Sequence, residues 1–302
     1  MGKRSRHRFR WMRFGGGPSR PGGASRQGGR KVGPPRRGGG IAIPGVIGQR
    51  LDRSGTRLAS ATIYPDERRS AWIGGEGASF PALPFGSCFA YLPGGRGPVC
   101  EEGRLLCTRL KSADPAWLPR LAAQVWLEMV GHGRFAAAFG ARVVLVPVPG
   151  SAPAGHADWV GERLAWCLRE IGLAAEVWPV LRRRHAVRKS AFAAAGERPS
   201  VLEHYASFAV ERAHPGRALL GPRNLASAPG EAGLQLTLVD DVITRGRTLL
   251  AAARKIRESF PGAEIRAFAL LRTLGANETL RQVLDPCEGE VCWVHADARR
   301  SP

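Results

Sequence analysis

From about residue 85 onwards, apolar residues recur along the chain with two different periods. Continuous runs of aliphatic and β-branched residues predict strands over residues 142–148, 176–181, 234–239 and 265–271. Apolar residues at every third or fourth position predict helices from Pro115 to Gly131, over 156–171 and over 249–260. Because strands and helices alternate at this spacing, right-handed βαβ units are expected. The pattern therefore predicts an α/β fold whose central, mainly parallel sheet is flanked by helices.

Two further segments give different predictions. Residues 89–92 and 104–110 have the composition of short strands joined by the loop 93–103, so we expect a hairpin within residues 85–115. The segment 182–205 is basic and poorly periodic, and we predict neither a helix nor a strand in it.

Charge is concentrated at the start of the chain. Of the net charge of +20, residues 1–40 contribute +12, with twelve Lys and Arg, twelve Gly and no acidic residue. These residues lack periodic apolar positions, so residues 1–75 are predicted to be a disordered basic tail and linker before a folded domain at 76–302. Such a tail could bind nucleic acid without sequence specificity by releasing counterions. The alternative is a dispensable extension.

Composition also bears on the compartment. The sequence contains no run of 18 or more apolar residues and no continuous apolar core of a signal peptide, which predicts a cytoplasmic protein without a membrane partner. None of its six cysteines forms a C-x-x-C pair, and reduced thiols are expected in that compartment.

Residues 234–248 carry the clearest chemical signal. An apolar run ends in the acidic pair Asp240 and Asp241, a loop rich in hydroxyl and cationic groups follows, and a helical pattern begins at Leu249. This order suits a sugar phosphate, because carboxylates accept hydrogen bonds from ribose hydroxyls, and residues 244–248 offer backbone N–H groups, two hydroxyls and a helix N-terminus to an anion. Gly246 allows close approach of the backbone. The alternative is a buried strand that ends in a solvated Asp-Asp turn.

The same stretch resembles the motif with which type I phosphoribosyltransferases bind phosphoribosyl pyrophosphate (PRPP). The resemblance implies the fold of that family, with a small hood made by the 85–115 hairpin and the C-terminal end. It also implies that Asp240 and Asp241 hold the ribose and that Mg²⁺ is the cofactor, bound by the pair directly or through water. Dimers are common in the family, so a homodimer is one implied assembly. The 5′-phosphate would lie on a phosphate loop formed by Thr244, Arg245, Gly246, Arg247 and Thr248.

A second resemblance, over residues 147–208, is to the ComF-like branch of this family, which is associated with DNA uptake. It is carried by Pro147-Val148-Pro149, Leu181-Arg182-Arg183, Glu197-Arg198 and Phe208. The resemblance implies that Gly150 and Ser151 contact pyrophosphate. It also places Arg188, Lys189 and Ser190 in a mobile loop, or lid, over the reacting centre, where Lys189 would act with the acidic pair in catalysis. The alternative for this basic segment is a solvated surface loop.

The chain departs from these families at several positions. The four-cysteine module of the ComF-like branch is missing, Ser190 replaces a loop glutamine, and Thr244 stands where 6-oxopurine enzymes have an aspartate base. A hypoxanthine- or guanine-type activity is therefore disfavoured. His132, His204 and His295 are scattered, and we assign them no role.

We accordingly expect a PRPP- and Mg²⁺-dependent pentosyltransferase that acts on an unidentified nitrogenous small-molecule acceptor. The alternative is a non-catalytic regulator that binds PRPP or a nucleotide, or a DNA-uptake accessory of the same fold. Such a regulator or accessory would keep the sugar-phosphate site without turning over.

Overall fold

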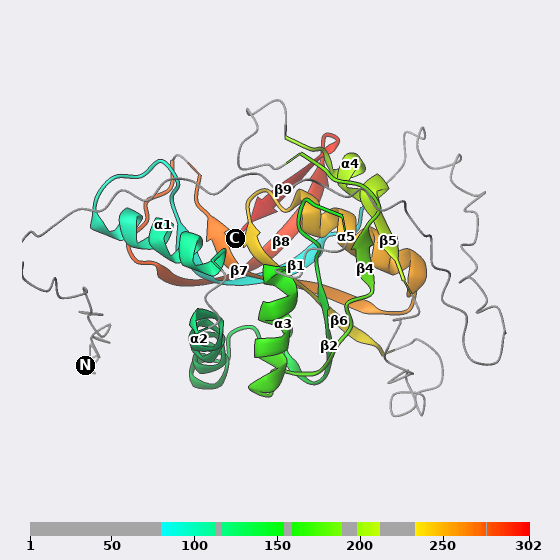
Figure 1. Ribbon diagram of the computed structural model, residues 1–302, viewed down its shortest axis with the longest axis horizontal. Coiled ribbons are helices and arrows are strands. Elements are labelled where there is room, and N and C mark those ends of the chain that lie inside the picture. The colour runs from blue at the N-terminus through cyan, green and yellow to red at the C-terminus, as the bar shows by residue number, and fades with distance from the viewer. Residues whose placement is uncertain (1–79, 113–115, 154–158, 189–197, 212–232, 276) are drawn as a thin grey trace, which may run out of the picture. The chain divides into compact units, whose positions relative to one another are not determined.

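A computed structural model of the protein describes residues 80–112, 116–153, 159–188, 198–211, 233–275 and 277–302 (Figure 1). The predicted tail at 1–75, its boundary with the folded domain and the predicted lid residues Lys189 and Ser190 lie outside the described residues. In the part that is described, no helix combines the length and the apolar character needed to cross a bilayer.

The helices and strands follow one another in this order: β1 Leu83–Tyr91, α1 Pro98–Leu110, α2 Trp117–His132, β2 Gly140–Pro147, α3 Val160–Glu170, β3 Ala174–Val177, β4 Leu181–Arg183, α4 Val201–Ser207, β5 Phe208–Val210, β6 Gln235–Ile243, α5 Arg247–Ser259, β7 Glu264–Thr273, β8 Leu284–Val294 and β9 Asp297–Ser301.

A seven-stranded sheet with the order β3-β2-β6-β7-β1-β8-β9 forms the centre of the domain. The first five strands run parallel to one another, while β8 and β9 are antiparallel to their neighbours. The short strands β4 and β5 pair separately. The predicted α/β architecture with a mainly parallel sheet is therefore confirmed.

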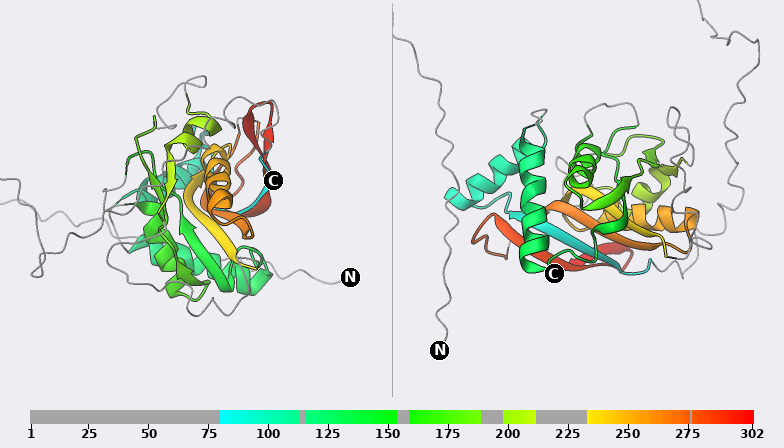
Figure 2. Two further views of the ribbon diagram at one scale, coloured as in Figure 1. Left: turned by 90° about the vertical axis from the view of Figure 1, so that its right-hand side faces the viewer. Right: turned by 90° about the horizontal axis from the view of Figure 1, so that it is seen from below.

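Helices cover both faces of this sheet (Figures 1 and 2). Alternate residues of β2 enter opposite cores: Val144 and Val146 pack in the core that contains α4 and α5, whereas Val143 and Leu145 pack in the core shared with α2 and α3. A strand that is buried on both faces is a continuous apolar run, which explains why the apolar pattern predicted β2, β6 and β7 well.

The strand order reverses between β2 and β6. From β2 the chain passes through α3 to β3 on one side, and from β6 it passes through α5 to β7 on the other side. Since β2 and β6 are parallel neighbours, the loops that follow them leave the same edge of the sheet in opposite directions. Such a reversal is where open α/β sheets bind ligands.

The predicted hairpin within residues 85–115 is wrong, because residues 98–110 form the helix α1. Pro98 occupies the first turn of this helix, where its missing N–H costs nothing, and Cys100, Gly103 and Leu110 form its buried side. These buried positions recur at helical spacing over the whole of α1, whereas the strand prediction rested on the short run 104–110 alone. The hairpin part of the predicted hood is thus replaced by α1, and the C-terminal end adds β8 and β9 to the main sheet.

The predicted strand over 176–181 is two strands in different sheets. β3 ends at Val177 and β4 begins at Leu181, with Pro179 between them, which cannot donate to a strand ladder. The predicted helix over 156–171 has Trp159 as its N-cap and begins at Val160. These corrections move element boundaries and leave the prediction of a mainly parallel sheet unchanged.

A helix also forms in the segment 182–205, where we predicted none. The N-cap of α4 is Ser200, whose hydroxyl accepts a hydrogen bond from the Glu203 N–H at 3.1 Å. The Glu203 carboxylate in turn accepts from the Ser200 N–H at 2.7 Å. This reciprocal capping box stabilises a helix that is only seven residues long.

Candidate functional site

The acidic pair lies within β6, whereas the sequence suggested that the strand ends there. The ladder with β7 continues beyond the pair to Ile243, which is paired with Arg272. Each carboxylate accepts a hydrogen bond from the next backbone N–H, Asp240 from Asp241 and Asp241 from Val242, both at 2.8 Å. The backbone of β6 itself therefore holds both carboxylates in place.

The surroundings of the pair favour the neutral form of Asp240. Burial, and then the neighbouring charge of Asp241, raise the pKa of Asp240 well above its usual value, and the guanidinium of Arg183 opposes the rise. On another side, Lys111 follows the last residue of α1. Burial lowers the pKa of Lys111, but the charges of Asp241, Cys107, Tyr91 and Asp240 together outweigh this and the net pKa is raised. Two cations from β4 and α1 thus lie near the two carboxylates.

The raised pKa of Asp240 predicts how stability changes with pH. Above its usual value of 3.8 the unfolded chain releases this proton while the folded chain keeps it, so the free energy of unfolding falls as pH rises through the raised pKa. Asp240→Asn removes this titration. In urea unfolding between pH 4 and pH 9, the variant is expected to gain stability relative to the wild-type protein as pH rises. A constant difference between the two proteins across this range contradicts the raised pKa.

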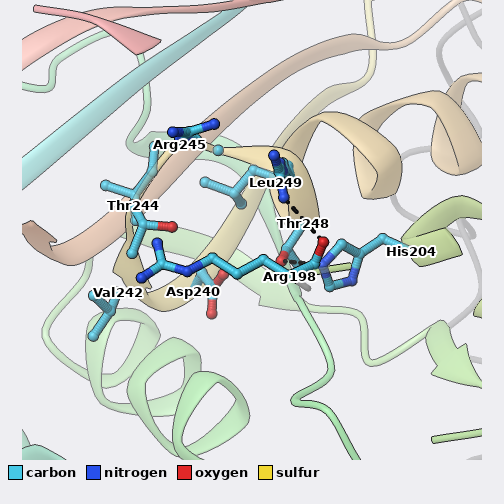
Figure 3. A pocket seen from close by; sticks show the side chains of 11 residues that line it. Arg198, His204, Asp240, Val242, Thr244, Arg245, Thr248 and Leu249 are labelled. Atoms are coloured by element: carbon cyan, nitrogen blue, oxygen red, sulfur yellow. Dashed lines mark hydrogen bonds between the residues drawn. The ribbon is translucent and has the colours of Figure 1, made fainter. Parts of the chain in front are cut away.

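A hollow opens beside the acidic pair at the N-terminus of α5. It is lined by Asp240, residues 242–249, Arg198 and His204, and contains about 400 Å³ of space free of atoms, part of it open to solvent. All five predicted phosphate-loop residues are therefore brought together with one carboxylate of the pair. In Figure 3 the side chain of Arg198 extends across the hollow toward Thr244 and Asp240. Arg198 comes from outside the 234–248 motif.

The start of α5 presents backbone donors to the hollow. Gly246 is the N-cap, in the left-handed region with φ of 84°, and no side-chain hydrogen bond of the described residues caps this end. The N–H groups of the first helical residues have no partner within the helix, since intrahelical bonds begin with Leu250 N–H donating to Gly246 O at 2.9 Å. These uncapped donors, with the positive end of the helix dipole, favour an anion.

Arg245 and Arg247 line the hollow, but their guanidinium groups bind Asp297 of β9. Arg247 forms a bidentate pair with Asp297, with Nη2 donating at 2.6 Å, and Arg245 donates at 3.0 Å. Arg247 also donates to the carbonyl groups of Arg198 and Pro199. The hydrogen bonds from Arg247 lower the pKa of Asp297. In this arrangement the two arginines attach the loop 244–248 to β9 and to the segment before α4.

The loop after β2 reaches the same region. The Val148 N–H donates to Val239 O at 2.8 Å, immediately before the acidic pair, and Gly150 and Ser151 follow. The segment after β4 returns to this loop, where Val187 N–H donates to Ser151 O at 2.9 Å. The predicted pyrophosphate loop and the start of the predicted lid therefore lie side by side.

Arg188 is exposed beside α4 and is not among the residues that line the hollow. The pKa of Glu203 is lowered first by its hydrogen bonds with Ser200, and the nearby charge of Arg188 lowers it further. Of the predicted lid cations, Arg188 thus lies near Glu203, and Lys189 is outside the described residues.

Three residues to which we had no reason from the sequence to assign a role contribute to this region: Lys111, His204 and Asp297. They come from α1, α4 and β9, far from residues 234–248 in the chain, so no local pattern links them to the motif. His204 was assigned no role from the sequence, and it lines the hollow. The capping box Ser200-x-x-Glu203 was the one sequence signal that could have placed His204 on a helix.

A comparison of the chain with models of known protein families finds no match, and a search of curated proteins finds no significant match.

Proposed function

We propose that the protein is a phosphoribosyltransferase that uses PRPP and Mg²⁺ to transfer a phosphoribosyl group to a nitrogenous small-molecule acceptor. One observation carries this proposal: Asp240, one of two adjacent carboxylates, lines the same hollow as the N-terminus of α5, where the strand order reverses. Acceptors for sugar hydroxyls beside donors for a phosphate match the two ends of a ribose 5-phosphate. A type I phosphoribosyltransferase fold is part of the proposal, and the parallel order β3-β2-β6-β7-β1 supports it.

In the proposed complex the acidic pair accepts hydrogen bonds from the ribose hydroxyls. The 5′-phosphate lies on the phosphate loop and receives the N–H groups at the start of α5, together with the hydroxyls of Thr244 and Thr248. The pyrophosphate group extends toward Gly150 and Ser151 on the neighbouring strand end. No protein nucleophile is required, because holding the donor and the acceptor in line supplies much of the rate enhancement.

The acidic pair also fits the chemistry of the proposed cofactor. Carboxylate oxygens are hard ligands that suit Mg²⁺, which commonly takes one or two of them and completes its shell with water and substrate oxygens. Burial and then the charge of Asp241 raise the pKa of Asp240, and a cation at the pair would relieve the repulsion between the two carboxylates. When bound, the ion would neutralise charge on the departing pyrophosphate.

A turnover assay tests the proposal and separates it from the regulator alternative. The protein is incubated with PRPP, Mg²⁺ and a panel of nitrogenous bases, and pyrophosphate release is measured beside direct titration of PRPP. We expect PRPP to bind, with release that depends on one class of base. Binding without release under any base supports the non-catalytic regulator. Failure to bind PRPP rejects both readings of the site.

A further inference from the structure

Buried side chains connect the loop after β2 to the N-terminus of α5. Arg183 and His204 are each only 4% exposed. Arg183 donates through Nε to Gly150 O and through Nη1 to Ser207 Oγ, and its Nη2 lies 3.1 Å from His204 Nδ1. On the other side of the imidazole ring, His204 Nε2 lies 3.4 Å from Thr248 Oγ1. The connection therefore runs from Gly150 through Arg183 and His204 to Thr248.

The chemistry of arginine fixes the direction of these hydrogen bonds. A guanidinium group has donors and no acceptor, so His204 Nδ1 must accept from Arg183. A neutral imidazole that accepts at Nδ1 carries its proton on Nε2, and this N–H donates to Thr248 Oγ1. Because the Thr248 oxygen then accepts from His204, its own hydroxyl proton is left to donate elsewhere. Thr248 lines the hollow, where a donor faces the space for an anion.

The surroundings of His204 keep the ring neutral at neutral pH. Burial, and then the charge of Arg183, lower its pKa to about 4, with Arg247 adding to the effect and Glu203 opposing it. These charged groups belong to β4, α5 and α4, the elements that pack around the ring. A second proton on the ring would place an N–H at Nδ1 against the Arg183 guanidinium.

We infer that Arg183 and His204 are positioning residues that hold the Thr248 hydroxyl as a hydrogen-bond donor to a bound phosphate and join the two loops at the strand ends. The phosphate in this inference rests on the proposed function. The direction of the hydrogen bonds does not, since it follows from the protein alone. The experiments below test these two parts separately.

The ligand-free protein tests the hydrogen-bond direction. In long-range ¹H–¹⁵N NMR spectra of histidine-labelled full-length protein, the His204 signals are assigned by their loss in His204→Gln. We expect a neutral ring protonated at Nε2 at pH 7, with no titration down to about pH 5. A ring protonated at Nδ1, or one that titrates between pH 6 and pH 7, overturns the inference whether or not any sugar phosphate binds.

Titration with ribose 5-phosphate tests the positioning role. In His204→Gln the amide oxygen can accept from Arg183 while the NH₂ group donates to Thr248, so affinity should remain close to that of the wild-type protein. In His204→Leu neither bond is possible, and affinity is expected to fall about tenfold, the loss typical of one hydrogen bond to a charged group. Thr248→Val should show a similar loss, and Thr248→Ser should not.

The double variant His204→Leu/Thr248→Val provides the sharpest outcome. If both residues act through one hydroxyl, the double variant binds ribose 5-phosphate no more weakly than either single variant. Additive losses overturn the positioning role, and so does a Gln variant that is as weak as the Leu variant while melting like the wild-type protein. If the wild-type protein itself fails to bind ribose 5-phosphate, the proposed function is rejected, and the NMR result still decides the hydrogen-bond direction.

Discussion

Replacing both Asp240 and Asp241 with asparagine is expected to abolish PRPP binding while leaving the domain folded. In the proposed complex the pair holds the ribose hydroxyls, and loss of a desolvated charge-assisted contact costs roughly 2–5 kcal/mol. The fold should tolerate the change, because asparagine has nearly the same volume and the double variant also removes the repulsion that raises the pKa of Asp240. Calorimetric titration of PRPP with Mg²⁺, beside thermal unfolding, measures both effects.

Glu258→Gln is the matched control for this variant. Glu258 lies near the C-terminal end of α5, where its carboxylate binds Arg254, Lys255 and Tyr205. The chemical change is the same, but the residue is about 15 Å along the helix from the phosphate loop. PRPP affinity should therefore be unchanged in the control. If the double variant also binds PRPP with unchanged affinity, the acidic pair does not hold the ribose.

Gly246→Ala is expected to weaken both the fold and phosphate binding. At φ of 84° an L-residue costs about 1–2 kcal/mol, and a Cβ would lie 2.6 Å from Val291 Cγ1 of β8, which adds an overpacking cost of about 1–3 kcal/mol. Movement of the loop away from β8 would displace the N–H groups at the start of α5. Urea unfolding measures the loss of stability, and titration of ribose 5-phosphate measures the loss of affinity.

Gly172→Ala separates the cost of the backbone angle from the cost of the contact with Val291. Gly172 has nearly the same backbone angle, with φ of 85°, but no atom lies within 4 Å of the position that a Cβ would take. It follows α3, outside the residues that line the hollow. This control carries the backbone cost alone, so it should be less destabilising than Gly246→Ala and should leave phosphate affinity unchanged. Equal destabilisation of the two variants argues against the contact with Val291.

The sequence predicted the elements whose apolar pattern is set by burial. β2, β6 and β7 are covered on both faces, and α5 has an apolar side formed by Leu249, Ala252, Ala253 and Ile256. These elements appeared at nearly the correct positions because the period of apolar residues is a local property. β8 is different, since Val291 is its one fully buried residue and its other positions alternate little. No strand was predicted there for that reason.

The composition of the site was predicted only in part. Asp240 and the residues 244–248 lie within one short stretch of the chain, so a strand before them and a helix after them were enough to bring them together. Lys111, His204 and Asp297 meet them through the order of strands in the sheet and through helix packing, which are tertiary properties. The pairing of Arg247 with Asp297 is an example: fifty residues separate the partners, and each alone looks like an ordinary charged residue.

The continuation of β6 through the acidic pair affects both the rate and the free energy of ligand binding. Asp240 is held opposite Ala269 and Val242 opposite Leu271, so the carboxylates are carried by a hydrogen-bonded ladder on a rigid strand. A ligand that docks on such a preformed surface loses little free energy to ordering the protein, and its association need not wait for a conformational change. The two carboxylates would thus not need to change position when the sugar binds.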